Sequence, residues 1–195
     1  MKASHRRDSI LASAAPLFNR NGFAGTSISE ILKAAHLEKG GLYNHFASKE
    51  ELAVASFDYA FERVKEYFTT ATAGIESGAP YLYAYLRAFE RYIERPVVEG
   101  GCPVANATFD SDDALPFLRT RVQAAFQQMR GLVQRHALRA IEKRQFRQDV
   151  DSETVADFVV ASLEGAILLS RGLRSRASGR RVAETLRQWL HSLEP

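Results

Sequence analysis

The chain has 195 residues, of which 46% are hydrophobic and 25% are charged, and it contains one cysteine. This composition is typical of a globular protein with one domain or two small ones, and it excludes a disordered chain. The single cysteine excludes an intrachain disulfide. Residues 77–86, the longest uncharged stretch near the middle, are too few for the roughly twenty apolar residues of a membrane-spanning helix. Since no apolar signal-peptide block follows the basic N-terminus, we expect a cytoplasmic protein without a membrane partner.

The small net charge of +3 is concentrated at the N-terminal end of the chain. Residues 1–50 hold seven basic and four acidic side chains, whereas the remaining 145 residues hold nineteen of each sign. A basic segment joined to a neutral one is expected if the first part of the chain binds a polyanion such as DNA. A chance fluctuation of three charges is the alternative, and the charge alone does not decide between them.

Apolar residues recur at intervals of three and four along almost the whole chain, and the alternating pattern of strands is essentially absent. The sequence therefore predicts an all-α protein with about nine helices. Two helix starts carry a capping box, in which a serine and a glutamate three residues later satisfy backbone amides: Ser27 with Glu30, and Ser48 with Glu51. In chain order, the predicted helices span residues 5–21, 27–35, 39–45, 48–71, 80–94, 103–109, 115–143, 152–173 and 179–193.

The first three predicted helices lie in the basic segment and suggest a helix-turn-helix. In this motif one helix braces the DNA backbone while the next enters the major groove. A small core would hold the two motif helices at a fixed angle, and its predicted members are Ile28, Ile31, Leu32, Leu42 and Phe46. We expect residues 1–47 to form this DNA-binding head and residues 48–195 to form a second, larger helical domain.

The segment GFAGTSISEILKAAHLEKGGLYNHFASKEEL, within residues 5–55, resembles the DNA-binding signature of the TetR family of bacterial transcriptional regulators. The later segment QFRQDVDSETVADFVVASLEGAILLSR is more loosely similar to the dimerisation half of many members. The resemblance implies that residues 48–195 bind a ligand and dimerise. It also implies a sequence-specific regulator, most often a repressor. Such a protein binds double-stranded palindromic operator DNA as a homodimer and is released by a small-molecule effector.

The third predicted helix supplies most of the expected DNA contacts. Lys39, at its start, is a long donor that can reach guanine in the major groove, and the two glycines after it allow close backbone approach. By the resemblance Tyr43 is the strongest candidate, with Thr26 and Lys49 as phosphate contacts near helix N-termini. The family more often has a hydroxyl residue where Glu38 stands, and a carboxylate there would repel phosphate unless it caps the helix. The complete expected set is Thr26, Ser27, Lys39, Gly40, Gly41, Tyr43, Asn44, His45 and Lys49.

The predicted helix 152–173 is apolar on nearly all sides, so it must be covered by its own core and by something else. The following helix offers a second apolar stripe. A two-fold interface formed by these two helices of each protomer would bury both, as in the family's dimer. Six arginines between residues 171 and 187 fit either a second nucleic-acid patch or a solvated loop. The expected interface residues are Phe158, Leu163, Gly165, Ala166, Leu169, Leu186, Trp189 and Leu190.

Aromatic residues are abundant between the two ends of the chain, and we expect most of them to be core. Some could enclose the apolar effector pocket that the resemblance implies. Cys102 lies in the Gly- and Pro-punctuated segment where the helical pattern lapses. It fits either a buried apolar filler or a thiol near a helix start that senses electrophiles or oxidants. The expected pocket residues are Phe61, Tyr85, Phe89, Cys102, Asn106, Phe109, Phe126 and Met129.

Two other classes of function compete with a DNA-binding regulator. A small α-helical enzyme would need a catalytic constellation, but the five histidines are scattered without metal-ligand spacing and no glycine-rich phosphate loop is present. We therefore expect no catalytic residues, no metal site and no cofactor. A helical adaptor without DNA binding would require the motif match to be accidental.

Overall fold

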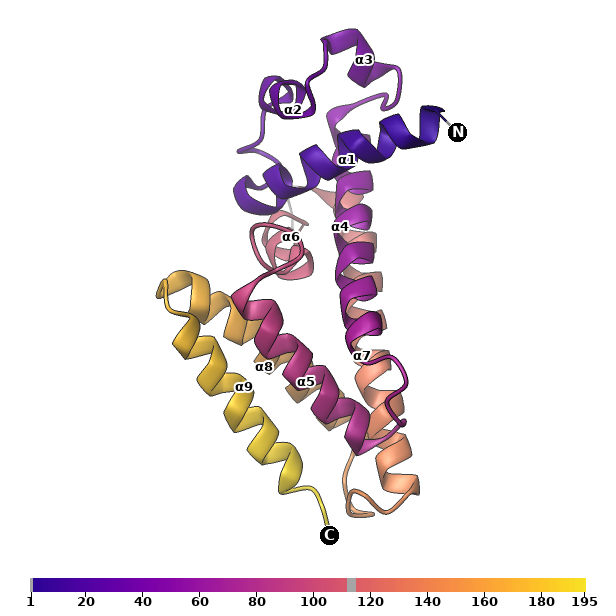
Figure 1. Ribbon diagram of the computed structural model, residues 1–195, viewed down its shortest axis with the longest axis vertical. Coiled ribbons are helices and arrows are strands. Elements are labelled where there is room, and N and C mark those ends of the chain that lie inside the picture. The colour runs from indigo at the N-terminus through magenta and orange to yellow at the C-terminus, as the bar shows by residue number, and fades with distance from the viewer. Residues whose placement is uncertain (1, 112–114) are drawn as a thin grey trace. The chain divides into compact units, whose positions relative to one another are not determined.

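The computed structural model describes residues 2–111 and 115–195 and contains, within these ranges, nine α-helices and no strand, which confirms the predicted all-α fold (Figure 1). None of the helices in these ranges is long and apolar enough to span a membrane. The helix boundaries lie within about three residues of the predicted ones. The helices are α1 (Lys2–Asn21), α2 (Ile28–Ala35), α3 (Lys39–Tyr43), α4 (Lys49–Ala71), α5 (Ala79–Glu94), α6 (Pro103–Ser111), α7 (Pro116–Glu142), α8 (Ser152–Gly172) and α9 (Arg176–His191).

The chain divides into two compact units. Unit 1 comprises Met1–Lys65 and Val98–Ala125, and unit 2 comprises Glu66–Val97 and Phe126–Pro195, so that α4 and α7 contribute to both. The predicted head falls wholly within unit 1, but unit 1 also contains α6, which the sequence placed in the second domain. A separate domain that ends at residue 47 stays a prediction.

Side-chain hydrogen bonds explain why α6 belongs to unit 1. The Nδ2 of Asn19, near the end of α1, donates to two carbonyl oxygens of the loop before α6, at 2.9 and 3.0 Å. The Nδ2 of Asn106, in α6, donates to the Asn19 carbonyl oxygen at 2.9 Å. Asp110 accepts the backbone N–H of Phe23 at 2.9 Å. Residues 98–111, far from α1 in sequence, are thereby fixed to its C-terminal end.

α9 lies along α5 and α8 in unit 2 (Figure 1) and begins three residues before its predicted start. The residues between the predicted helices 152–173 and 179–193 were expected to form a loop, but the chain is helical from Arg176 onward. Glycine usually favours a loop, but Gly179 lies where α8 and α9 contact each other. A Cβ at this position would lie 2.2 Å from the Ser170 hydroxyl oxygen and 3.0 Å from the Ala166 carbonyl oxygen. The missing side chain therefore allows α8 and α9 to approach closely.

Replacing Gly179 by alanine is expected to lower the free energy of unfolding by about 1–3 kcal/mol, because the backbone carbonyl of α8 cannot move aside cheaply. Urea unfolding followed by circular dichroism measures this change. Gly172→Ala is the matched control. It also lies within a helix, but no atom lies within 4 Å of its added Cβ. Equal stability of the two variants would show that the close approach at Gly179 is not a constraint.

Several arginines of α9 form ion pairs with acidic residues of α5. Arg187 lies 3.3 Å from Glu90, while Arg176 and Arg180 both pair with Glu94, Arg176 at 3.6 Å. Such partly exposed pairs contribute little to stability, but they neutralise positive charge. The arginine-rich region therefore offers less free charge for a second nucleic-acid patch than the sequence alone suggests.

His136, in α7, is expected to make unit 2 less stable in acid. Its ring stacks on Tyr81 with centroids 3.5 Å apart, and burial, assisted by the nearby charge of Arg135, lowers the pKa of His136 from 6.5 to about 4. As the pH falls, the unfolded chain therefore binds this proton first. The stabilisation by the neutral ring is complete above pH 6.5 and is lost between there and about pH 4.

We therefore expect the urea midpoint of unfolding to fall between about pH 7.5 and about pH 4.5. In His136→Phe, which keeps an aromatic ring but cannot titrate, this fall should be smaller. An identical fall in the variant would assign the acid sensitivity to other groups.

Candidate nucleic-acid interface

One apolar core fixes α1, α2, α3 and the start of α4 within unit 1. Ile31 from α2 and Leu42 from α3 are at most 1% exposed, and Phe46, just after α3, is equally buried. Ile28 and Leu32 pack against this core as partly buried residues, so the predicted motif core is confirmed. Burial of an aliphatic or aromatic side chain of this size contributes about 1.5–3 kcal/mol. The buried members are Ile10, Leu11, Ala14, Ile31, Leu42, Phe46 and Leu52.

Caps and backbone geometry set the direction in which α3 leaves α2. The Ser27 hydroxyl accepts the Glu30 N–H, and the Glu30 carboxylate accepts the Ser27 N–H at 2.8 Å, which confirms the predicted capping box. The bond from the Ser27 backbone holds the pKa of Glu30 below its ordinary value. At the other end of α2, His36 adopts a left-handed backbone with φ of 52°, and its N–H bonds back to α2 carbonyl oxygens.

The short helix α3 turns one side to the core and the other to solvent. Leu42 points into the core, whereas the Tyr43 side chain is 42% exposed. An added Cβ at Gly40 would meet no atom within 4 Å, so the start of α3 offers open backbone to a binding partner. Among the predicted contact residues of this region, Lys39, Gly40, Tyr43 and Asn44 are exposed, and Gly41 and His45 are partly buried.

Thr26 and Ser27, two predicted contacts before α2, hydrogen-bond within the protein. Thr26 is 0% exposed, and its hydroxyl donates to the Gly22 carbonyl oxygen at 2.8 Å. This differs from the accessible hydroxyl that a phosphate contact requires. Ser27 is exposed, but its hydroxyl lies 2.7 Å from the Glu30 carboxylate, whose charge opposes a phosphate at this point.

Lys49, the remaining predicted DNA contact, connects the first turn of α4 to the turn before α2. Its Nζ donates to the Phe23 carbonyl oxygen at 2.6 Å and lies 4.2 Å from the centre of the Phe23 ring. A lysine ammonium has three N–H donors. A DNA phosphate would therefore share Lys49 with this carbonyl.

The start of α4 differs in one detail from the predicted capping box. The Glu51 N–H donates to the Ser48 hydroxyl at 3.2 Å, as expected. The Glu51 carboxylate, however, accepts the N–H of Ala47 at 2.7 Å, one residue earlier than the box requires. The backbone N–H groups of Ala47 and Glu51 are thus both satisfied by nearby side chains.

Two charged residues at this surface were not among the predicted contacts. The Arg7 guanidinium lies 4.8 Å from the centre of the Phe46 ring, a cation–aromatic contact that places it beside the end of α3. The basic pair Arg6 and Arg7 near the N-terminus was the sequence signal for it. Glu38 is the N-cap residue of α3 by its backbone, but its side chain forms no capping hydrogen bond. Its exposed carboxylate is therefore available to an amino group of a base, such as cytosine N4.

Unit 2 carries an apolar surface on α8 and α9. On α8 the side chains of Phe158 and Leu169 are each 46% exposed, and the Phe158 ring contacts Trp189 of α9 at 4.5 Å between centroids. A groove of about 370 Å³ runs between these helices. Of the predicted interface residues, Phe158 and Leu169 are exposed, Gly165 and Trp189 are partly buried, and Leu163, Ala166, Leu186 and Leu190 are core of the protomer.

The predicted effector residues belong to both units. Those in unit 1 are Phe61, Cys102, Asn106 and Phe109, and those in unit 2 are Tyr85, Phe89, Phe126 and Met129. Phe109 is 74% exposed, unlike the enclosed position expected for it. Cys102 is 4% exposed and directly precedes α6. The burial of Cys102 favours a role as an apolar filler, because a reagent must reach the sulfur of a sensor cysteine. An effector pocket built from the eight predicted residues stays a prediction.

Comparison with known proteins identifies relatives of both halves of the chain. Residues 10–55 match the family described as bacterial regulatory proteins, tetR family. Residues 78–193 match the family described as tetracyclin repressor-like, C-terminal domain. The HTH-type transcriptional repressor DhaR of Mycobacterium sp. (strain GP1) is 26% identical to this chain over 87% of its length and 84% of the relative's.

Solved structures give the same result over nearly the whole chain. A TetR transcriptional regulator from Chloroflexus aurantiacus J-10-FL is 40% identical with a TM-score of 0.92, and the match covers 97% of this chain and 96% of that one. A TetR-family transcriptional regulator from Cytophaga hutchinsonii is 30% identical with a TM-score of 0.88, over 100% of this chain and 97% of that one.

Proposed function

Because the chain belongs to the TetR family of bacterial transcriptional regulators, which are not enzymes, we propose that it is a homodimeric repressor of transcription. It binds a palindromic operator in double-stranded DNA and is released from it by a small-molecule effector. Its partners are operator DNA, a second copy of the chain and the effector, and it acts in the bacterial cytoplasm.

The exposed side of α3 is the observation that carries DNA binding. Leu42 and Phe46 anchor the helix, while Lys39 and Tyr43 stand in solvent beside the open backbone of Gly40. A lysine can donate to guanine in the major groove, and a tyrosine hydroxyl can donate to a phosphate. Bare backbone beside them lets DNA approach closely. Each of these properties suits a helix that enters a groove.

The apolar surface of α8 supports dimerisation. Phe158, Leu169 and Leu173 are large apolar side chains that are 46%, 46% and 63% exposed in the single chain. These three side chains also line the groove between α8 and α9. An exposed apolar surface of this kind can pack against the same surface of a second copy. Two heads held by such a contact would read two half-sites one helical turn apart, about 34–36 Å.

Release by an effector requires that the effector bind the DNA-competent and DNA-incompetent states with different affinity. The family relationship supports an effector, and aromatic residues such as Tyr85 and Phe89 are buried in unit 2. A saturating ligand that prefers the DNA-incompetent state would lower operator affinity by at most the factor of that preference.

A gel-shift and footprinting experiment on DNA from upstream of the protein's own gene tests the proposal. We expect a two-fold symmetric footprint and an affinity that falls about 10³-fold between 50 and 200 mM salt, because phosphate contacts release counterions. Random DNA of the same length should bind far more weakly. Equal affinity for both DNAs would reject sequence-specific binding, and an asymmetric footprint would reject the palindromic operator.

A further inference from the structure

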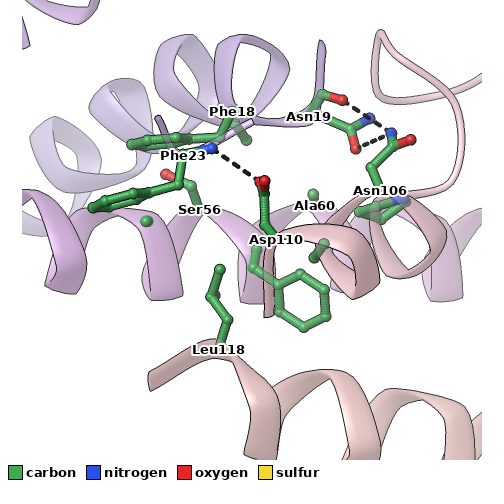
Figure 2. Close-up of a pocket in the computed structure, with 13 residues that line it drawn as sticks. Phe18, Asn19, Phe23, Ser56, Ala60, Asn106, Asp110 and Leu118 are labelled. Atoms are coloured by element: carbon green, nitrogen blue, oxygen red, sulfur yellow. Dashed lines mark hydrogen bonds between the residues drawn. The ribbon is translucent and has the colours of Figure 1, made fainter. Parts of the chain in front are cut away.

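Unit 1 contains a cavity of about 40 Å³ that no predicted site anticipates (Figure 2). Residues of α1, α4 and α6, the turn after α1 and the start of α7 line it, all within unit 1. Of the residues predicted for the effector pocket, only Asn106 is among those lining it. One water needs roughly 10–15 Å³ by this measure, so the cavity has room for about three groups of that size.

Ser56 of α4 contributes a polar group that has no hydrogen-bond partner among the described residues. The side chain is 1% exposed, and its Oγ lies buried against the cavity without a hydrogen bond. Buried hydroxyl groups in folded proteins almost always have a partner. An unpaired one that lines a cavity therefore indicates that the cavity holds a molecule with which it can bond.

Asp110 of α6 contributes a negative charge to the same cavity (Figure 2). One of its oxygens accepts the Phe23 N–H at 2.9 Å, and in the described part of the chain no basic side chain pairs with this carboxylate. Lys49, the lysine that contacts Phe23, donates to its carbonyl oxygen instead. A partly buried carboxylate without a cation favours a ligand that brings one.

The remaining walls are mainly apolar and include the phenyl rings of Phe18, Phe23 and Phe57. Aromatic rings attract organic cations through their faces. A metal ion is a poorer fit, because the described residues contain no cluster of three His, Cys, Asp or Glu side chains that could hold one. The wall chemistry therefore combines an anionic acceptor, an unpaired hydroxyl and aromatic surface.

We infer that this cavity binds a small primary ammonium ion with two carbon atoms. Its nitrogen donates hydrogen bonds to the Asp110 carboxylate and the Ser56 hydroxyl, and its alkyl part packs against the phenyl rings. Three non-hydrogen atoms match the space available. The inference does not depend on DNA binding or on the effector pocket predicted from the sequence.

Ethylammonium chloride, titrated into the full-length protein with calorimetric and NMR detection, is the first test. We expect saturable binding with a Kd on the order of 1 mM, near the limit for so small a ligand. Ethanol, the neutral molecule of the same size, should bind at least about tenfold more weakly, because it lacks the charge that strengthens the bond to Asp110. Tetraethylammonium should not bind, because it exceeds the cavity. Absence of ethylammonium binding, or equal binding of ethanol, would overturn the inference.

Variants locate the binding to this cavity. Asp110→Asn keeps an oxygen that can accept the Phe23 N–H but removes the charge, and should weaken ethylammonium binding at least about tenfold. Ser56→Ala should weaken it by a smaller factor. Asp149→Asn, an exposed carboxylate in unit 2, is the matched control and should bind like the wild type. Circular dichroism checks that each variant is folded. Unchanged binding in both Asp110→Asn and Ser56→Ala would mean that the ion binds elsewhere, and the ethanol comparison decides the question if Asp110→Asn does not fold.

Discussion

Replacing Leu169 by glutamate is expected to convert the proposed homodimer to a monomer and to weaken operator binding by at least about 100-fold. Leu169 lies on the exposed apolar side of α8, and its side chain is 46% exposed in the single chain. In a two-fold contact the substitution places two carboxylates in the same apolar interface, where neither has a partner. A monomer also loses the gain in affinity from binding two half-sites at once, which is commonly 10²–10⁴-fold. Sedimentation equilibrium and gel-shift titration measure the two effects.

Leu138→Glu provides a control of the same chemistry. Leu138 is also an exposed leucine of unit 2, at 45%, but it belongs to α7 rather than to the apolar side of α8. We expect this variant to remain dimeric and to bind the operator normally. If Leu169→Glu is dimeric as well, the proposed interface on α8 is wrong, whatever the operator affinity.

Replacing Tyr43 by alanine is expected to weaken operator binding by about 10- to 100-fold without unfolding the head. The ring is 42% exposed and is not part of the core around Leu42 and Phe46, so little packing is lost. A hydrogen bond to a charged group such as a DNA phosphate contributes about 1.5–3 kcal/mol. Gel-shift titration gives the affinity, and urea unfolding shows that stability is maintained.

Tyr43→Phe separates the two parts of this contact. It keeps the ring and removes only the hydroxyl, so a smaller loss than in Tyr43→Ala would assign part of the affinity to the ring. Ile75→Ala, at a residue that is 40% exposed in unit 2, controls for the loss of an exposed apolar side chain and should leave operator affinity unchanged. Normal operator affinity in Tyr43→Ala would remove Tyr43 from the interface.

Features that depend on neighbours in sequence were predictable. The Ser27–Glu30 capping box follows from two side chains three residues apart, and the structure has both of its hydrogen bonds. The motif core followed from the spacing of apolar residues, and Ile31, Leu42 and Phe46 are buried as that spacing predicts. Such patterns need no knowledge of how distant segments meet.

Features that depend on distant partners were not predictable. Lys49 contacts the carbonyl oxygen and the ring of Phe23, which is 26 residues away. The sequence therefore did not indicate that this lysine, a predicted phosphate contact, also bonds within the protein. A glycine at position 179 favours a loop in a sequence-based prediction, because its close contact with α8 is visible only in the structure. For the same reason the cavity beside Ser56, formed by helices distant in sequence, left no recognisable pattern in the chain.

The hydrogen bonds between α1 and the α6 region determine which residues must be exchanged together when the DNA-binding head is moved into a relative. Asn19, Asn106 and Asp110 join residues on either side of the boundary at which a sequence-based division would cut. A chimera that received residues 1–47 alone would leave behind the acceptor of the Phe23 N–H and the amide that bonds to Asn19. An exchange of DNA specificity between relatives should therefore transfer residues 98–111 together with the head, or replace them with residues that reproduce these bonds.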